Sequence, residues 1–198
     1  MPSSKIEGTP RERLLAAANE LFYAEGVHTV GIDRVIERAG VAKASLYSTF
    51  GSKDELVRAY LEQRYVKRQA RILDWIAKYE EPRDKILGLF ELLGVVFAEP
   101  TFRGCAFMKA SAEAPVGEKI RDVCDTYRAW LLDLFAQLAR DAGADDPAEL
   151  ARHLLVLHDG ATFGATMDGD VTRAADARTL AEALLNARTR AGKRRARR

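Results

Sequence analysis

The chain has 198 residues, of which 47% are hydrophobic and 30% charged, and its formal net charge is +2. That length allows one large domain or two small ones with a real apolar core, and no apolar run approaches the roughly 20 residues that cross a bilayer. Because residues 1–10 also lack the apolar stretch of a signal peptide, we expect a cytoplasmic protein with no membrane partner. Cys105 and Cys124 are then most simply reduced, with a redox-sensing pair as the alternative.

The net charge conceals an asymmetry between the C-terminus and the rest of the chain. Residues 188–198 hold seven basic residues and no acid, so the remaining residues sum to −5. Global charge therefore gives no argument for a nucleic-acid partner. We expect residues 191–198 to form a basic, disordered tail, with nonspecific DNA binding or contact with acidic partners as the alternative.

The first helical pattern begins at Thr9, after an expected flexible N-terminal arm of residues 1–8. Thr9 can cap the helix, Pro10 fits its first position, and Glu12 can reach back to complete a capping box. The apolar residues that follow recur at helical spacing, and Gly26 is expected to end the helix near residue 25.

Two short helical patterns meet at a turn within residues 31–50. In the first, apolar residues recur at i, i+3, i+4 and i+7 from Ile32 to Ala39, and Thr29 is the expected N-cap. The turn needs a residue with positive φ, which Gly40 adopts at little cost. The apolar residues of the second pattern fall four apart and should face the first helix: Ala42, Leu46 and Phe50.

The other face of that second helix is small, polar and free of acidic side chains. Lys43 and Tyr47 lie one turn apart on it; a lysine can reach a phosphate or a guanine edge, and a tyrosine can offer its hydroxyl to phosphate and its ring to a thymine methyl. Two small side chains, those of Ala44 and Ser48, let the helix approach the floor of the groove. The hydroxyl groups of Ser45 and Thr49 border this face and can donate to phosphates. Such a helix suits a DNA groove, whereas singly Lys43 is an ordinary surface charge and Tyr47 an ordinary packing residue.

A second capping box, from Ser52 to Glu55, opens a long helix that should run to about residue 79. Over residues 9–56 this order of features resembles the DNA-binding domain of TetR/AcrR-family transcriptional regulators, and the matching residues after the first helix are Gly26, Thr29, Ile32, Ala39-Gly40-Val41, Leu46-Tyr47, Phe50, Ser52-Lys53 and Leu56. One departure is Thr49, where the family often has histidine. The resemblance implies that Thr29, Gly31 and Lys53 hold the DNA backbone at helix starts, where helix dipoles and unpaired N–H groups favour anions.

Beyond residue 56 the chain reads as further amphipathic helices. Prolines mark their boundaries, and no segment alternates with period two over a useful length, so we expect an all-α protein. The expected helices span residues 84–98, 104–113, 116–142, 147–168 and 173–190. An N-terminal three-helix domain with a helix-turn-helix is thus followed by a larger helical domain, residues 57–190, for which the resemblance implies effector binding and dimerisation.

The resemblance also implies a homodimer on a palindromic DNA operator, since helix-turn-helix proteins usually bind two half-sites by two-fold symmetry. The dimer surface is expected on the last two long helices. Their apolar stripes, which are also typical of ordinary core, are Leu150, Leu154, Leu157 and Ala161 on one helix and Leu180 and Leu184 on the other.

A small-molecule effector is the second partner that the resemblance implies. It would occupy a cavity in residues 57–190 and shift the DNA-reading heads apart. Apolar candidates for the cavity wall, each of which could equally be plain core, are Phe90, Phe97, Phe107, Met108, Tyr127, Trp130, Phe163 and Met167.

Nothing in the sequence assembles into a catalytic site, so we expect no enzyme, no cofactor and no metal. His153 and His158 share a helical face poorly, which makes them weak metal ligands even with Asp159. We predict a ligand-responsive, sequence-specific DNA-binding regulator, more often a repressor than an activator, that an apolar or amphipathic effector releases from its operator. The alternative is a small all-α ligand-binding protein or enzyme that binds no operator.

Overall fold

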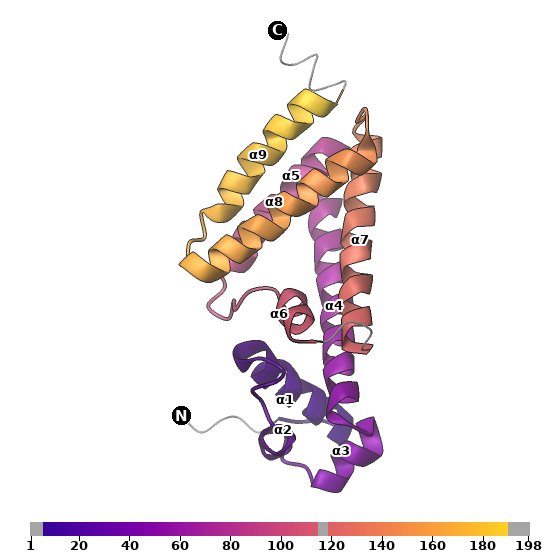
Figure 1. Ribbon diagram of the computed structural model, residues 1–198, viewed down its shortest axis with the longest axis vertical. Coiled ribbons are helices and arrows are strands. Elements are labelled where there is room, and N and C mark those ends of the chain that lie inside the picture. Colours follow the sequence, from indigo (N-terminus) through magenta and orange to yellow (C-terminus); the bar gives the residue numbers. More distant parts are fainter. Residues whose placement is uncertain (1–5, 115–118, 190–198) are drawn as a thin grey trace. The chain divides into compact units, whose positions relative to one another are not determined.

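The computed structural model describes residues 6–114 and 119–189. Within these residues the chain forms nine α-helices and no β-strand (Figure 1), which confirms the predicted all-α fold. The expected basic tail and the first five residues of the expected N-terminal arm lie outside the described part of the chain. In that described part, no helix is both long enough and apolar enough to span a membrane.

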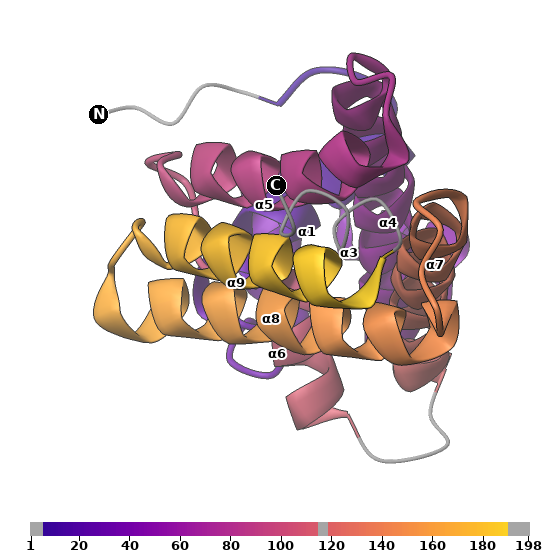
Figure 2. The same cartoon turned by 90° about the horizontal axis from the view of Figure 1, so that it is seen from above.

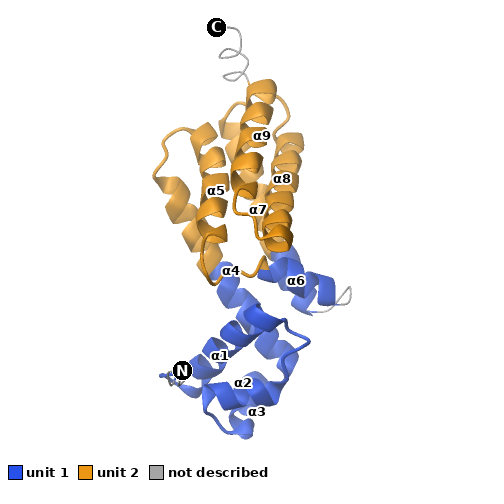
Figure 3. Ribbon diagram, turned by 90° about the vertical axis from the view of Figure 1, so that its left-hand side faces the viewer, with its two compact units in different colours: residues 1–66, 106–126 blue, residues 67–105, 127–198 orange. Residues whose placement is uncertain are grey.

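The chain forms two compact units, coloured separately in Figure 3. The first contains residues 1–66 and 106–126, and the second contains residues 67–105 and 127–198. Two helices, α4 (Lys53–Ala77) and α7 (Lys119–Asp141), contribute residues to both units.

The first unit begins with α1 (Pro10–Glu25), α2 (Ile32–Ala39) and α3 (Lys43–Phe50). The predicted capping box is present at α1: the Glu12 N–H donates to the Thr9 hydroxyl at 3.3 Å, and the Thr9 N–H donates to the Glu12 carboxylate at 2.8 Å. Leu14, Phe22 and Leu46 are buried, so α1 and α3 share one small core.

Two local predictions in this unit are wrong. The N-cap of α2 is Gly31 with no side-chain cap, and Thr29 lies two residues earlier in an exposed turn. Ala42 is the N-cap of α3 and is exposed, because Leu46 is the buried residue of that helix.

At α4 the Ser52 hydroxyl accepts the Glu55 N–H at 3.1 Å as predicted. The Glu55 carboxylate, however, forms ion pairs with Arg58 and Lys119 at 2.7 Å each.

The second unit is built around α5 (Pro82–Phe97), α8 (Pro147–Asp168) and α9 (Arg173–Arg188). Helix α9 lies between α5 and α8 and packs on both (Figure 2). Small residues of α9 make this close packing possible: Ala174, Ala177 and Ala181 are all buried. Elsewhere on α5, Gly88 leaves room for the Tyr79 ring, whose hydroxyl donates to the Glu91 carboxylate at 2.5 Å.

Candidate nucleic-acid interface

The turn between α2 and α3 is fixed by Gly40 and Arg13. Gly40 ends α2 in the left-handed region, with φ 62° and ψ 42°, and its N–H donates to the Glu37 carbonyl at 3.1 Å. Residues other than glycine rarely adopt this backbone conformation, because their Cβ makes it costly. The Arg13 guanidinium of α1 donates to the Gly40 carbonyl at 3.1 Å, so α1 holds the turn in place.

The face of α3 that the sequence assigned to DNA is open to solvent. Four of its residues are exposed, namely Lys43, Ala44, Ser48 and Thr49, and Ser45 is half-buried. Tyr47, which has a large aromatic side chain, is 47% exposed. Tyr47 thus keeps nearly half of its surface open to solvent, while Leu46 next to it is fully buried and anchors the helix. The arrangement matches a recognition helix, which presents one face to base edges while the other is anchored in the protein.

Acidic side chains neutralise three cations around this helix. The Lys43 ammonium lies 2.8 Å from the Asp33 carboxylate of α2, which raises the pKa of Lys43 through the hydrogen bond and the adjacent negative charge. Two further ion pairs join arginines of α2 to acids of α1: Arg34 with Glu25 at 2.7 Å and Arg38 with Glu20 at 2.8 Å. The arginine pairs fasten α2 to α1, whereas the lysine pair lies across the helix-turn-helix itself.

The flanking positions of the predicted site are also accessible. Thr29 and Gly31 are exposed before the start of α2, and Lys53 is half-buried as the first residue of α4. The start of α2 has no side-chain cap, whereas the Ser52 hydroxyl caps the start of α4; helix N-termini of this kind favour anions. All nine predicted DNA-contact residues therefore belong to the first unit, and six of them lie on α3.

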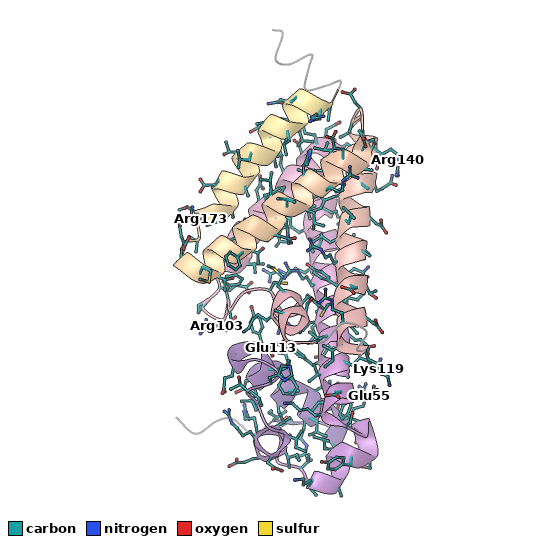
Figure 4. The ribbon with its side chains drawn as sticks, viewed as in Figure 1. Glu55, Arg103, Glu113, Lys119, Arg140 and Arg173 are labelled. Carbon is teal, nitrogen blue, oxygen red and sulfur yellow. The ribbon has the colours of Figure 1, made fainter. Side chains whose placement is uncertain are left out.

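Helix α6 (Ala106–Glu113) belongs to the same unit and contacts the end of α1. The Lys109 ammonium donates to the Tyr23 carbonyl at 3.1 Å, near the negative end of the α1 dipole. The Glu113 carboxylate, labelled in Figure 4, accepts the His28 N–H at 3.2 Å. Lys119 and Glu55, which lie side by side in the same figure, join the start of α7 to the start of α4. Sequence reasoning missed this docking, because the contacts connect residues 64 to 86 positions apart.

The predicted effector-cavity residues are divided between the two units. Phe107 and Met108 belong to the first unit, whereas the other six belong to the second. Phe90, Phe97 and Tyr127 are buried in the second unit, and Trp130 is half-buried with its ring centroid 6.4 Å from that of Tyr127. Phe163 and Met167 are exposed on α8, so the structure removes them from any internal wall.

A buried polar group lies among these aromatic side chains in the second unit. His158 of α8 is buried with its ring 6.3 Å from that of Phe135, and its Nδ1 is 3.5 Å from the Asp159 carboxylate, beyond good hydrogen-bond distance. Burial lowers the pKa of His158 more than Asp159 raises it. Arg128 pairs with Asp159 at 2.7 Å. The signal for this group in the sequence is the adjacent His158 and Asp159 at the middle of the helix, next to the apolar run from Leu154 to Leu157.

The dimer stripe that was predicted on α8 lies on the wrong side of that helix. Leu150, Leu154 and Ala161 are buried inside the subunit and present no surface to a second chain, and Leu157 is half-buried. The exposed apolar stripe of α8 consists instead of Val156, Phe163 and Met167. On α9, Leu180 is exposed and Leu184 half-buried, so these two predicted residues remain at the surface.

Comparisons with known proteins agree with this geometry. The family model for bacterial regulatory proteins of the tetR family matches residues 14–60. The HTH-type transcriptional regulator LmrA of Bacillus subtilis is 28% identical over 144 residues, which cover 70% of this chain and 76% of LmrA. The HTH-type transcriptional repressor NemR of Escherichia coli is 30% identical over 134 residues, covering 66% of this chain and 67% of NemR. A crystal structure of a TetR-family transcriptional regulator from Streptomyces coelicolor superposes with a TM-score of 0.86 at 31% identity, covering 91% of this chain and 96% of that one.

An exposed recognition helix on a compact helical unit defines a DNA-binding transcriptional regulator of the helix-turn-helix class. The chain belongs to the TetR family of bacterial regulatory proteins. The predicted function as a ligand-responsive DNA-binding regulator is confirmed, and its relatives are regulators rather than enzymes. Regulators of this family bind DNA and act as dimers.

Proposed function

We propose that this protein is a homodimeric repressor that binds a palindromic operator and leaves it when an apolar or amphipathic small molecule binds. Residues 9–56 form the DNA-binding domain of this proposal, and residues 57–190 the effector-binding and dimerisation domain. The relative NemR, which is similar over most of this chain, is a repressor and supports repression rather than activation.

The observation that carries the proposal is the exposed, acid-free face of α3. Lys43, Ala44, Tyr47, Ser48 and Thr49 are accessible together, on a helix that Leu46 anchors in the core. In the proposed complex this face enters the major groove, with Lys43 and Tyr47 near base edges and the hydroxyl groups on phosphates. Thr29, Gly31, Ser45 and Lys53 then contact the DNA backbone on either side.

The second subunit of the proposed dimer covers the apolar surface of α8 and α9. Val156, Phe163 and Met167 recur at i, i+7 and i+11, so they share one face of α8, and Gly160 between them has open space above it. Leu180 and Leu184 extend this surface onto α9. Two-fold pairing of such a face makes the same patch on each subunit self-complementary.

The effector of the proposal binds in the second unit, near the buried Phe90 and Tyr127 and the half-buried Trp130. Apolar linings with few polar groups are typical of small-molecule sites, and the polar atoms of Tyr127 and His158 lie in the same unit. A ligand that prefers the DNA-free conformation by about 3 kcal/mol would shift the equilibrium roughly a hundredfold.

The test is DNA binding by wild-type protein and the Tyr47→Ala variant. Duplexes selected by the wild-type protein from a random pool supply the operator, and fluorescence anisotropy measures affinity as a function of salt. We expect Tyr47→Ala to weaken operator binding at least tenfold, about 1.4 kcal/mol, while the far-UV circular dichroism spectrum and melting temperature stay unchanged. Wild-type affinity in Tyr47→Ala removes this residue from the interface, and failure of the wild-type protein to select any sequence refutes operator binding.

A further inference from the structure

The Lys43–Asp33 ion pair lies within the surface that is proposed to contact DNA. Lys43 is the first residue of α3 and Asp33 the second residue of α2. Their side chains are 57% and 78% exposed, and the Nζ to Oδ1 distance is 2.8 Å. A donor and an acceptor are therefore held side by side at the solvent-exposed end of the recognition helix.

A carboxylate at this position opposes ordinary binding to the DNA backbone. Nonspecific affinity comes almost entirely from cations that neutralise phosphates. A phosphate that approaches Lys43 must compete with Asp33 for the ammonium group, and it also meets the negative charge of that carboxylate within the range of electrostatic interaction. A contact between a backbone phosphate and Lys43, the kind of contact on which nonspecific binding depends, is thus disfavoured here.

The surrounding charges strengthen this selection against arbitrary DNA. Arg34 and Arg38, the nearest arginines along α2, are held by Glu25 and Glu20. Residues 6–66 carry eight lysines and arginines against nine aspartates and glutamates. A DNA-binding unit without net positive charge depends on specific contacts for its affinity.

A G·C base pair has the chemistry that suits this ion pair. In the major groove guanine presents the acceptors O6 and N7, and cytosine beside it presents the N4 amino donor. A lysine recognises the guanine acceptors and an aspartate accepts from the cytosine amino group. An A·T pair places its amino donor between the acceptors N7 and O4. It therefore lacks the two adjacent purine acceptors that one ammonium group can bridge on guanine, and this difference favours the G·C pair.

We propose that Lys43 and Asp33 act together to read one G·C base pair in each half-site, with Asp33 as a specificity-determining residue. The proposal rests on the proposed placement of α3 in the major groove. Asp33 then has two opposite effects: it strengthens binding to the operator through the cytosine contact, and it weakens binding to arbitrary duplexes through competition for Lys43.

Asp33→Asn tests the proposal, with Glu37→Gln as a matched control. Both substitutions remove one negative charge from the exposed side of α2, but Glu37 is not the partner of Lys43. Affinities for the selected operator, for a duplex of scrambled sequence and for operators with each half-site position replaced are measured at several salt concentrations. Asp33→Ser repeats the measurement with a smaller side chain, and thermal melts confirm that each variant is folded.

We expect Asp33→Asn to bind the scrambled duplex about three- to tenfold more tightly, with a salt slope steeper by about 0.9, as for one added phosphate contact. Its operator affinity should fall, and its discrimination at one G·C position should decrease about five- to a hundredfold, while Glu37→Gln shifts both affinities in the same direction. Equal gains on both duplexes, or unchanged discrimination at every position, overturn this inference and leave operator binding intact. Failure of the wild-type protein to prefer any sequence refutes instead the proposed function.

Discussion

The exposed stripe of α8 makes a quantitative prediction about dimerisation. Phe163 has the largest side chain in this stripe, and 58% of the residue is exposed in the subunit. Phe163→Ala removes most of that apolar surface without opening a hole in the subunit core. The variant should therefore fold normally and dimerise more weakly.

The size of the effect follows from the exposed fraction. Complete burial of a phenylalanine contributes about 1.5–3 kcal/mol, so covering the exposed part of Phe163 contributes roughly 1–1.5 kcal/mol after the retained methyl group of alanine is allowed for. Two-fold symmetry places two copies in one interface. The dimer should lose about 2–3 kcal/mol, which is roughly a 30- to 150-fold increase in its dissociation constant.

Sedimentation equilibrium over a range of protein concentrations measures this constant, and Val66→Ala is the matched control. Val66 is 62% exposed and apolar but belongs to α4, so its truncation should leave the dissociation constant unchanged. Operator binding by Phe163→Ala should weaken at low protein concentration, since one half-site supplies little affinity. An unchanged dissociation constant in Phe163→Ala, or an equal change in both variants, refutes the assignment of this stripe to the dimer.

Two further predictions concern the second unit. In α5, Gly88→Ala should destabilise the protein by about 1–2 kcal/mol, because the new Cβ would lie 2.4 Å from the Tyr79 ring and the cost of overpacking exceeds the gain in helix propensity. In the same helix, Gly94→Ala should stabilise the protein by about 0.5–1 kcal/mol, because its Cβ would meet only Ala174 at 3.6 Å. Urea unfolding at one protein concentration compares the two, and stabilisation by Gly88→Ala would show that the Tyr79 ring moves aside. His158 has a lowered pKa in the folded state, so unfolding takes up a proton and stability should fall as the pH drops below about 6.5, the ordinary value. His158→Gln should flatten this part of the profile of melting temperature against pH, and an unchanged slope would mean that other groups cause it.

Local interactions explain why the helices were predictable from sequence. The capping box of Thr9 and Glu12, the hydroxyl cap of Ser52 and the positive φ of Gly40 each depend on residues within four positions of one another. Such signals act before any long-range contact forms. The prediction of Thr29 as a cap failed because Gly31 begins α2 with extended backbone and no side-chain cap, an alternative that the pattern of residue types did not distinguish.

The sequence by itself determined that the protein is helical, where most of its helices begin and end, and which short helix carries an acid-free face suited to DNA. Only the tertiary structure decided which apolar stripe of α8 is core and which is surface, since Leu154 and Phe163 are equally apolar and their burial depends on how α9 packs against that helix. It also decided that Asp33 faces Lys43 while Arg34 reaches back to Glu25. The physical reason is range: hydrogen bonds and caps within a helix link neighbours in the chain, whereas burial and ion pairing depend on which segments meet in space.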